Sequence, residues 1–231
     1  MNVAVKRRFL CFTIVVLIVW IVLWRLKSQA KLTVNREIIK IAPAVISVFY
    51  EALCPDSKNF VLKQLTPTVE KLPDWVYLEL IPYGKATTTT NPDGTFSFEC
   101  QHGQRECEAN MYHACSIDVV KDNKTMLAII DCMITDNLNP EAAMTKCVKE
   151  LADDETLQSI NKCFSSQQSK DLLKMYGEKT NALRPRMRFV PTVTIDGSQG
   201  TQALILKNLY LEVCKVLSGG GPMPKECEDN M

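Results

Sequence analysis

Cys54 opens the segment Cys54-Pro55-Asp56-Ser57, which is the part of the sequence best suited to redox chemistry. An apolar run over residues 45–50 precedes it, and a stretch with helical spacing over residues 58–72 follows it. A strand, a Cys-x-x-Cys pair and a helix form the usual frame of a thiol–disulfide oxidoreductase site. Here the fourth position holds a serine hydroxyl in place of the second thiol. Because one sulfur must attack and another must release the mixed disulfide, we expect an attacking cysteine without its resolving partner.

Cys54 itself has two interpretations. A thiol at the start of a helix can act as a nucleophile, because the positive end of the helix dipole favours a thiolate. A hydrogen bond from Ser57 would support this effect, whereas the negative charge of Asp56 would oppose it. The alternative is an inert relic that remained after the reaction was lost. We favour the relic, because a reactive thiol must also be exposed to its substrate.

The elements that would position Cys54 belong to an α/β fold. Residues 44–50 and 75–81 are predicted strands, and the helix between them makes a β-α-β unit with parallel pairing. Pro67 is expected to kink or shorten that helix. Further along the chain we predict a loop or irregular hairpin over residues 86–99, a strand over 187–197 and a helix over 200–217.

The segment 100–184 has a different character from the rest. It is rich in Lys, Glu, Gln, Ala, Met and Leu, which favours short helices around residues 104–117, 125–131, 140–151 and 169–179. Short amphipathic helices bury little apolar surface by themselves. We therefore expect disulfides to join them.

Length and charge exclude some classes of function. The chain has 231 residues, 46% of them apolar, and a formal net charge of +1. This length suits one domain or a domain with an insertion. The near-neutral charge gives no basis for nucleic-acid binding, so we expect none.

The N-terminus has the pattern of a secretory leader. Basic residues over 6–8 precede an apolar run over 9–24, and Ser28-Gln29-Ala30 offers small residues for cleavage. We expect a signal peptide over residues 1–30 and a secreted, endosomal or lysosomal product. The alternative is an uncleaved signal anchor and a type II membrane protein, which is the only case in which we expect membrane contact.

The cysteine count agrees with a missing resolver. Cys11 lies in the leader, which leaves nine cysteines for an oxidising lumen, an odd number. If Cys54 is the unpaired thiol, the other eight can form four disulfides. These eight are Cys100, Cys107, Cys115, Cys132, Cys147, Cys163, Cys214 and Cys227. Cys107 and Cys115 cannot pair with each other if they share a helix, because they would lie about 12 Å apart.

Other candidate sites are weaker. The only two histidines, His102 and His113, lie close to Cys107 and Cys115, but the spacing matches no zinc pattern. Because lumenal cysteines are usually oxidised, we expect no metal site and no cofactor. Asn123 begins an Asn-x-Thr acceptor for N-glycosylation in a predicted lumenal loop.

The segment Cys100-Gln101-His102-Gly103 to Cys115 points to a family. It matches C-Q-H-G-x-x-E-C-x-x-N-x-x-x-x-C, the signature of the gamma-interferon-inducible lysosomal thiol reductases (GILT). Pro82-Tyr83-Gly84-Lys85-Ala86 resembles the P-Y-G-x-A segment of that family, and Val190-Pro191 is similar to its cis-proline loop. The resemblance covers about residues 44–217.

The resemblance implies a thioredoxin-like domain, a β-α-β core interrupted by a disulfide-bonded helical insertion. The expected parts are a first thioredoxin-like segment over 44–99, the insertion over 100–184, a second segment over 185–217 and a tail over 218–231. Members of the family reduce protein disulfides in acidic endosomes and lysosomes with a Cys-x-x-Cys pair. Cys54 matches the attacking cysteine and Pro191 the cis-proline, but Ser57 does not match the resolving cysteine. Thr192 stands where several relatives carry an aromatic residue.

Three functions are compatible with these residues. The first, which we favour, is a secreted or vesicular glycoprotein that has lost dithiol reductase activity and works by binding a protein partner. The second is a monothiol oxidoreductase or isomerase that uses Cys54 on disulfide-containing proteins, with external thiols as the resolver. The third is a redox-independent structural or regulatory protein that keeps its membrane anchor.

Overall fold

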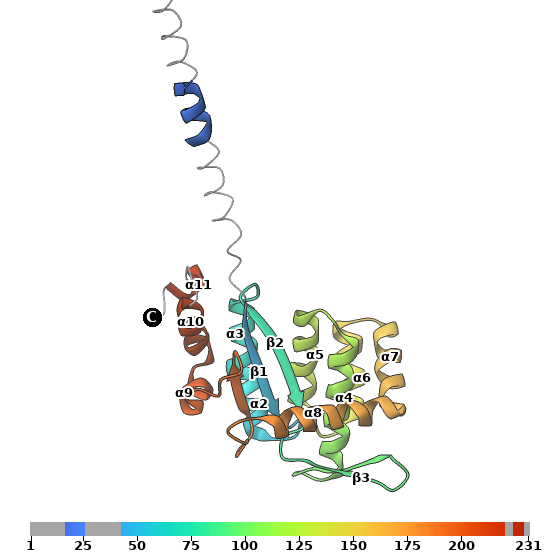
Figure 1. Ribbon diagram of the computed structural model, residues 1–231. Helices are drawn as coiled ribbons and strands as arrows, with labels where there is room; N and C mark the ends of the chain where they lie inside the picture. The colour runs from blue at the N-terminus through green and yellow to red at the C-terminus, as the bar shows by residue number, and fades with distance from the viewer. Residues whose placement is uncertain (1–16, 26–42, 220–223, 229–231) are drawn as a thin grey trace, which may run out of the picture. The chain divides into compact units, whose positions relative to one another are not determined.

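A three-stranded sheet forms the centre of the computed structural model, which describes residues 17–25, 43–219 and 224–228 (Figure 1). Its strands are β1 (Ala44–Tyr50), β2 (Val76–Pro82) and β5 (Thr192–Ile195), in the order β2-β1-β5. β1 pairs with β2 in parallel and with β5 antiparallel. The predicted first strand and its parallel β-α-β pairing are therefore confirmed. β1 is buried almost throughout, which suits its β-branched and aromatic residues.

The connection from β1 to β2 is helical but not one regular helix. It consists of α2 (Pro55–Phe60), a π-helical segment η1 (Val61–Leu65) and α3 (Thr66–Lys71). Pro67 has no N–H to donate to the preceding turn. A wider π turn just before a proline accommodates that missing hydrogen bond. The predicted interruption near Pro67 takes the form of a change of helix type, which divides the connection into shorter helices.

After β2 the chain forms a small hairpin of β3 (Thr87–Thr90) and β4 (Phe96–Glu99). Its turn contains Gly94, whose φ of 83° lies in the left-handed region that favours glycine. The predicted alternative of an irregular hairpin is thus confirmed over this segment.

Five helices form the helical insertion. They are α4 (Gln104–Val119), α5 (Asn123–Thr135), α6 (Pro140–Leu151), α7 (Asp154–Ser165) and α8 (Gln167–Ala182). The bounds of α6 match the prediction, since Asn139 caps it by accepting a hydrogen bond from the Ala142 amide and Pro140 occupies its first turn. The sequence interpretation missed α7, although Asp153 caps it in the same way.

The C-terminal elements are shorter than predicted. The strand expected over 187–197 is limited to Thr192–Ile195, because Pro191 has no amide for a sheet ladder and the residues before Val190 are largely exposed. The expected helix over 200–217 is two helices, α9 (Gln202–Lys207) and α10 (Leu209–Gly219). Asn208 separates them and accepts a hydrogen bond from the Leu211 amide. A short helix, α11 (Lys225–Glu228), follows.

The buried apolar residues form three clusters. The sheet core includes Ile46, Val48, Leu65, Leu78 and Val193, together with residues of α5 and α10. The insertion core consists of the following buried residues: Tyr112, Cys115, Ile129, Met133, Met144, Cys147, Val148, Ile160 and Cys163. A junction cluster lies between β2 and the helices α4 and α8, and it contains Phe49, Ile81, Tyr83, Cys100, Cys107, Met111, Ala114, Leu173 and Tyr176.

Helix α5 belongs to two of these clusters. Leu127, Ile130 and Ile134 pack in the sheet core, whereas Ile129 and Met133 pack in the insertion core. Residues 43–231 accordingly form one compact unit. The helical insertion is therefore packed on the sheet and is not a separate body.

The N-terminal residues 1–42 form a second unit, in which residues 17–25 are helical. Within the part of the chain that the structure describes, no helix has both the length and the apolar composition that a bilayer crossing requires. The proposed cleavage site at Ser28-Gln29-Ala30 and the basic residues 6–8 lie outside the described residues.

Candidate functional site

Cys54 lies at the end of the turn that joins β1 to α2. It is the N-cap residue of α2, and its carbonyl oxygen accepts a hydrogen bond from the Lys58 amide at 3.0 Å. Its own amide donates to the Glu51 carbonyl at 3.3 Å. Only 7% of the residue is exposed. Cys54 is therefore largely covered in this conformation.

Ser57 occupies the resolving position and is fully buried. Its Oγ accepts a hydrogen bond from the Glu51 amide at 3.3 Å. Among the described residues, no hydrogen bond joins this hydroxyl to the Cys54 sulfur. The hydroxyl therefore supports the turn before Cys54 and takes no visible part in thiol chemistry.

The remaining described cysteines are all in disulfides. The pairs are Cys100–Cys107, Cys115–Cys163, Cys132–Cys147 and Cys214–Cys227, and Cys54 is free. Cys107 and Cys115 share α4 and each has a partner elsewhere, as their separation along one helix requires. As disulfides they cannot supply thiolate ligands to a metal.

The signature segment supports the turn that carries Cys54. The Cys100–Cys107 disulfide closes the loop at the start of α4, where Gly103 has a φ of 81°. In the second turn of α4, the Asn110 side chain accepts a hydrogen bond from the Ala52 amide at 2.9 Å. Asn137, in the connection after α5, donates to the Ala52 carbonyl, also at 2.9 Å. Two residues of the helical insertion thus fix the backbone two positions before Cys54.

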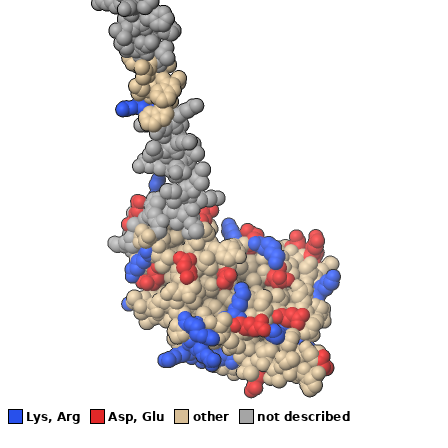
Figure 2. Space-filling view, in the orientation of Figure 1, with Lys and Arg blue, Asp and Glu red and all other residues tan. Residues whose placement is uncertain are grey.

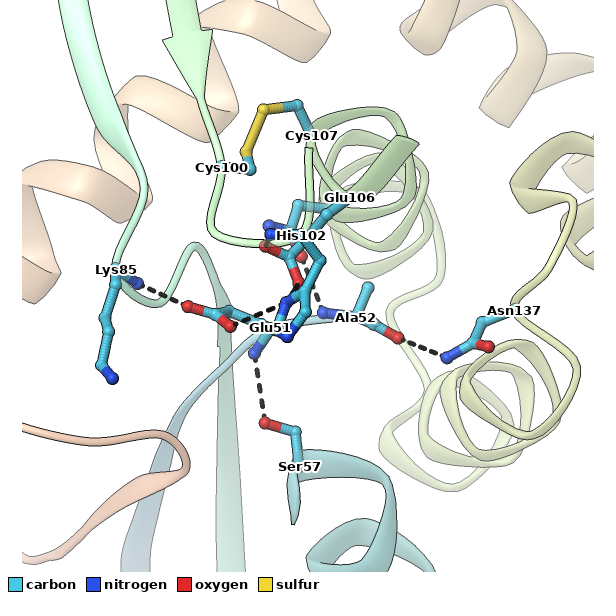
Figure 3. A network of polar contacts seen from close by, with 10 residues as sticks. Glu51, Ala52, Ser57, Lys85, Cys100, His102, Glu106, Cys107 and Asn137 are labelled. Carbon is cyan, nitrogen blue, oxygen red and sulfur yellow. Dashed lines mark hydrogen bonds and ion pairs between the residues drawn. A yellow bond between two sulfur atoms is a disulfide. The ribbon is translucent and has the colours of Figure 1, made fainter. Parts of the chain in front are cut away.

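Glu51, His102 and Glu106 form a polar cluster beside this turn (Figure 3). His102 Nδ1 lies 2.5 Å from Glu106 Oε2 and 3.4 Å from Glu51 Oε2. Both carboxylates are buried, whereas about a third (34%) of the His102 side chain is exposed. Burial raises the pKa of Glu51, and the nearby charge of Glu106 acts in the same direction.

Gly84 makes room for Glu51. A Cβ at position 84 would lie 2.1 Å from Glu51 Cγ, and the φ of Gly84 is +60°. Steric space and backbone conformation therefore both require glycine here. The next residue, Lys85, donates its backbone amide to Glu51 Oε1 at 2.8 Å. This contact joins the segment around Gly84 to Glu51.

His113 is buried on the same face of α4 as Glu106 and Asn110, further along the helix. Its Nδ1 lies 2.9 Å from the Tyr50 hydroxyl, and burial lowers its pKa to about 3. Burial also raises the pKa of Tyr50. Because both groups are neutral, this pair is a structural hydrogen bond between β1 and the helical insertion.

A groove of about 500 Å³ runs beside the Cys54 turn. Its walls come from α2 and η1 on one side, including Asp56 and Lys63, and from Phe189 and Pro191 on the other. The Val190–Pro191 peptide bond is cis. Thr192 is buried, and its hydroxyl donates to the Phe189 carbonyl at 2.6 Å. The structure thus brings Pro191 and the residues that follow Cys54 to one groove.

The surface around these features carries both signs of charge. On the face shown in Figure 2, acidic and basic side chains are interspersed, apart from one group of basic side chains at the lower left.

Asn123, the predicted N-glycosylation acceptor, is exposed and is the first residue of α5. The acceptor therefore lies at the start of a helix and not in a loop.

Comparison with known proteins gives the family. Residues 45–151 match the family described as gamma interferon inducible lysosomal thiol reductase (GILT). A protein of that name from Carassius auratus is 32% identical over 183 residues, covering 78% of this chain and 71% of the relative. The chain belongs to the GILT family. The resemblance that the signature predicts is therefore confirmed.

Further relatives agree with this assignment to the GILT family. A GILT-like protein from Anopheles gambiae is 34% identical over 197 residues, covering 80% of each chain. Among solved structures, the thiol-disulfide oxidoreductase MdbA of Actinomyces oris has a TM-score of 0.55 at 11% identity, covering 79% of this chain and 84% of its own. That similarity shows the fold alone. The thioredoxin-like core with a disulfide-bonded helical insertion is confirmed.

Sequence reasoning missed the contribution of Glu51 to the site. The residue directly follows the predicted strand, and a carboxylate at the end of a buried apolar run was a signal that could have drawn attention to it. Its contacts come from residues 85, 102 and 106, which only the fold brings together. The role of Asn137 was missed for the same reason.

Proposed function

We propose that this GILT-family protein is a secreted or vesicular glycoprotein that has lost dithiol reductase activity and works by binding a protein partner. The observation that carries the proposal is the buried Ser57 at the resolving position. Cys54 is the one free cysteine among the described residues, so no second thiol stands ready to replace the missing resolver. The leader pattern and the exposed Asn123 support a glycosylated lumenal product.

The chemistry of a lone thiol stops at a covalent intermediate. The Cys54 thiolate would attack one sulfur of a substrate disulfide, forming a mixed disulfide and expelling the other substrate sulfur as a thiolate. A resolving thiolate would then attack Cys54 and release the second substrate sulfur. Without it, an external thiol must attack the mixed disulfide, at the low concentration of free solute. A neighbouring thiol acts at an effective concentration of about millimolar or above.

The groove supports the binding half of the proposal. It combines the apolar surfaces of Phe189 and Pro191 with Asp56 and Lys63, which suits an extended polypeptide segment. Partner binding there would not require that Cys54 react. The disulfide-rich insertion keeps the Cys54 turn in place through Asn110 and Asn137 whether or not the thiol is used.

A monothiol oxidoreductase or isomerase is the second candidate. The free state of Cys54 and its position as N-cap of α2 favour it. In that case the partner is a disulfide-containing protein substrate, and small thiols supply the resolving step. The two candidates differ in whether partner engagement needs the sulfur of Cys54.

Activity is tested with the wild type, Ser57→Cys and Ser57→Ala, each secreted from a eukaryotic host. Reduction of a disulfide-containing protein is followed at pH 5 and pH 7 with a fixed external thiol. We expect Ser57→Cys to exceed the wild type by about 100-fold or more, in line with the effective concentration of a resolver. Ser57→Ala should match the wild type. Equal turnover in the wild type and Ser57→Cys would overturn the loss of dithiol activity.

Partner binding is tested by cross-linking in the secretory lumen, followed by mass spectrometry. A partner retained by Cys54→Ser but lost in Phe189→Ala supports non-covalent binding in the groove. A partner lost in Cys54→Ser and recovered from the wild type as a mixed disulfide supports the monothiol enzyme instead.

A further inference from the structure

We propose that Glu51, His102 and Glu106 bind one divalent transition-metal ion, and that Zn²⁺ is the ion that their donor atoms fit best. Each residue offers one ligand atom, and these atoms all lie within 4.8 Å of one another. The sequence interpretation expected no metal site, because it considered only the histidines with Cys107 and Cys115. The proposed site uses a different donor set and does not depend on the proposed function.

The two carboxylates are held so that each presents one oxygen to the imidazole. Glu51 Oε1 accepts a hydrogen bond from the Lys85 amide at 2.8 Å, and Glu106 Oε1 accepts one from the His102 amide at 3.0 Å. Their Oε2 atoms are the ones that approach His102 Nδ1 (Figure 3). Hydrogen bonds of this kind, to the atoms that do not bind the metal, orient ligands in known metal sites.

Glu51 supplies a second and independent indication of a ligand. Its side chain is fully buried, and its Oε2 has no hydrogen-bond partner. This unpaired oxygen points into the cluster, 3.4 Å from His102 Nδ1. Within the described part of the chain, no lysine or arginine forms an ion pair with either carboxylate. Among the described residues, His102 is the single ion-pair partner of the two carboxylates, and one imidazole can carry at most one positive charge. A divalent metal ion coordinated by both carboxylates would balance both negative charges.

The donor set matches zinc chemistry. One imidazole nitrogen and two carboxylate oxygens make three protein ligands, which leaves a fourth tetrahedral position for water. Zinc bonds of about 2.0–2.2 Å place tetrahedral ligand atoms about 3.4 Å apart. The Nδ1–Oε2 separation to Glu51 already has that value, at 3.4 Å, and the separation to Glu106, at 2.5 Å, would have to widen. Because His102 is partly exposed, its ring has room to move and the ion has a path from solvent.

An ion at this position would connect separate segments of the chain. Glu51 begins the turn that leads to Cys54, whereas His102 lies in the loop closed by the Cys100–Cys107 disulfide and Glu106 in the first turn of α4. Zinc bound by all three would join the Cys54 turn to that loop. The bound ion should therefore stabilise the folded chain in addition to occupying a site.

The test is a titration of the full lumenal chain, without an affinity tag and freed of metal by a chelator. Zinc chloride is added at pH 7 in a calorimeter, and thermal unfolding is measured with and without the ion. We expect one Zn²⁺ per chain and a higher Tm in its presence. Glu51→Gln and His102→Gln should each weaken binding at least about 10-fold, as loss of a ligand does more than loss of an outer contact. Glu108→Gln, an exposed carboxylate on the same helix, should bind as the wild type does.

Two further readouts keep the test decisive. His102 is partly exposed, so His102→Gln should fold even if Glu51→Gln does not. X-ray absorption at the zinc edge should show nitrogen and oxygen ligands only. Absence of saturable binding, equal affinity in His102→Gln, or a sulfur ligand in the spectrum would each overturn the proposal.

Discussion

The sheet core and the insertion core share α5 but differ in what holds their parts together. In the sheet core, β1 pairs with strands that follow it by about 30 and 150 residues, so backbone hydrogen bonds join distant segments. Its one disulfide, Cys214–Cys227, closes a loop at the C-terminal end. The insertion core contains Cys115, Cys147 and Cys163, and its helices are 12 to 16 residues long. We therefore expect the short helices to depend on their covalent links more than the strands do.

The largest expected loss of stability comes from removing the disulfide that closes the longest loop in the insertion core. Cys115→Ala with Cys163→Ala opens a loop of 48 residues, which should lower the free energy of unfolding by about 4 kcal/mol. Removing Cys132–Cys147, a loop of 15 residues, should cost about 3 kcal/mol. Urea unfolding followed by circular dichroism measures both. A loss below about 1 kcal/mol for the longer loop would mean that packing alone holds the helices.

The sheet core should lose stability when a buried apolar side chain is shortened and a cavity is left. Leu65 is fully buried in η1, so Leu65→Ala should lower the free energy of unfolding by about 3 kcal/mol. Leu62, in the same segment, is only partly buried, and Leu62→Ala is the matched control with a smaller loss. The same urea experiment applies. Equal losses for the two leucines would contradict the assignment of Leu65 to the sheet core.

Low pH should destabilise the folded chain through His113, which links β1 to the helical insertion by its hydrogen bond with Tyr50. Its pKa is about 3 in the folded chain and near 6.5 when unfolded, so the unfolded chain binds the extra proton as the pH falls below 6.5. This contribution to stability is complete above pH 6.5 and is lost progressively toward pH 3. Between pH 7 and pH 5 the loss should be about 2 kcal/mol. His113→Asn keeps a polar atom for Tyr50 but cannot take up this proton. Urea unfolding at pH 7 and pH 5 should therefore show a smaller loss of stability in His113→Asn than in the wild type, by about 2 kcal/mol. An equal loss in both proteins would contradict a buried, neutral His113.

The smallest expected effect concerns the hydrogen bond from Ala52 to Asn110. Asn110→Ala leaves the buried Ala52 amide without an acceptor, but it also removes an Nδ2 group that has no partner. Because these two effects oppose each other, the free energy of unfolding should fall by only about 1 kcal/mol. The turn before Cys54 should loosen, so alkylation of Cys54 should become faster than in the wild type. Leu138→Ala, at an exposed residue next to Asn137, is the control. An unchanged alkylation rate in Asn110→Ala would show that this hydrogen bond does not limit access to Cys54.

Local signals in the sequence predicted much of this fold. The bounds of β1 and α6 followed from an apolar run and from the Asn139-Pro140 start signal. The same logic applied to Asp153 would have predicted α7. The π-helical segment before Pro67 was not predictable from periodicity, because a proline allows several local adjustments.

The site was predictable only in part. Cys54 and Ser57 were recognised from a local pattern and Pro191 from the resemblance to the GILT family. The structure places Pro191 in a groove with the residues that follow Cys54. The cluster of Glu51 with His102 and Glu106 depends on contacts between segments about 50 residues apart, for which no spacing rule exists. The disulfide partners were likewise open, since eight cysteines allow many pairings.

The arrangement of the disulfides in the insertion has a consequence for proteolysis. The exposed connections between α4 and α5, α5 and α6, and α6 and α7 all lie between Cys115 and Cys163. A protease that cuts any of them leaves two fragments that the Cys115–Cys163 bond still joins. In a lumen that contains proteases, the nicked chain would remain one molecule for as long as that bond is oxidised. Reduction of this bond would then determine when the fragments separate, and after a cut between α5 and α6 the Cys132–Cys147 bond would have to be reduced as well.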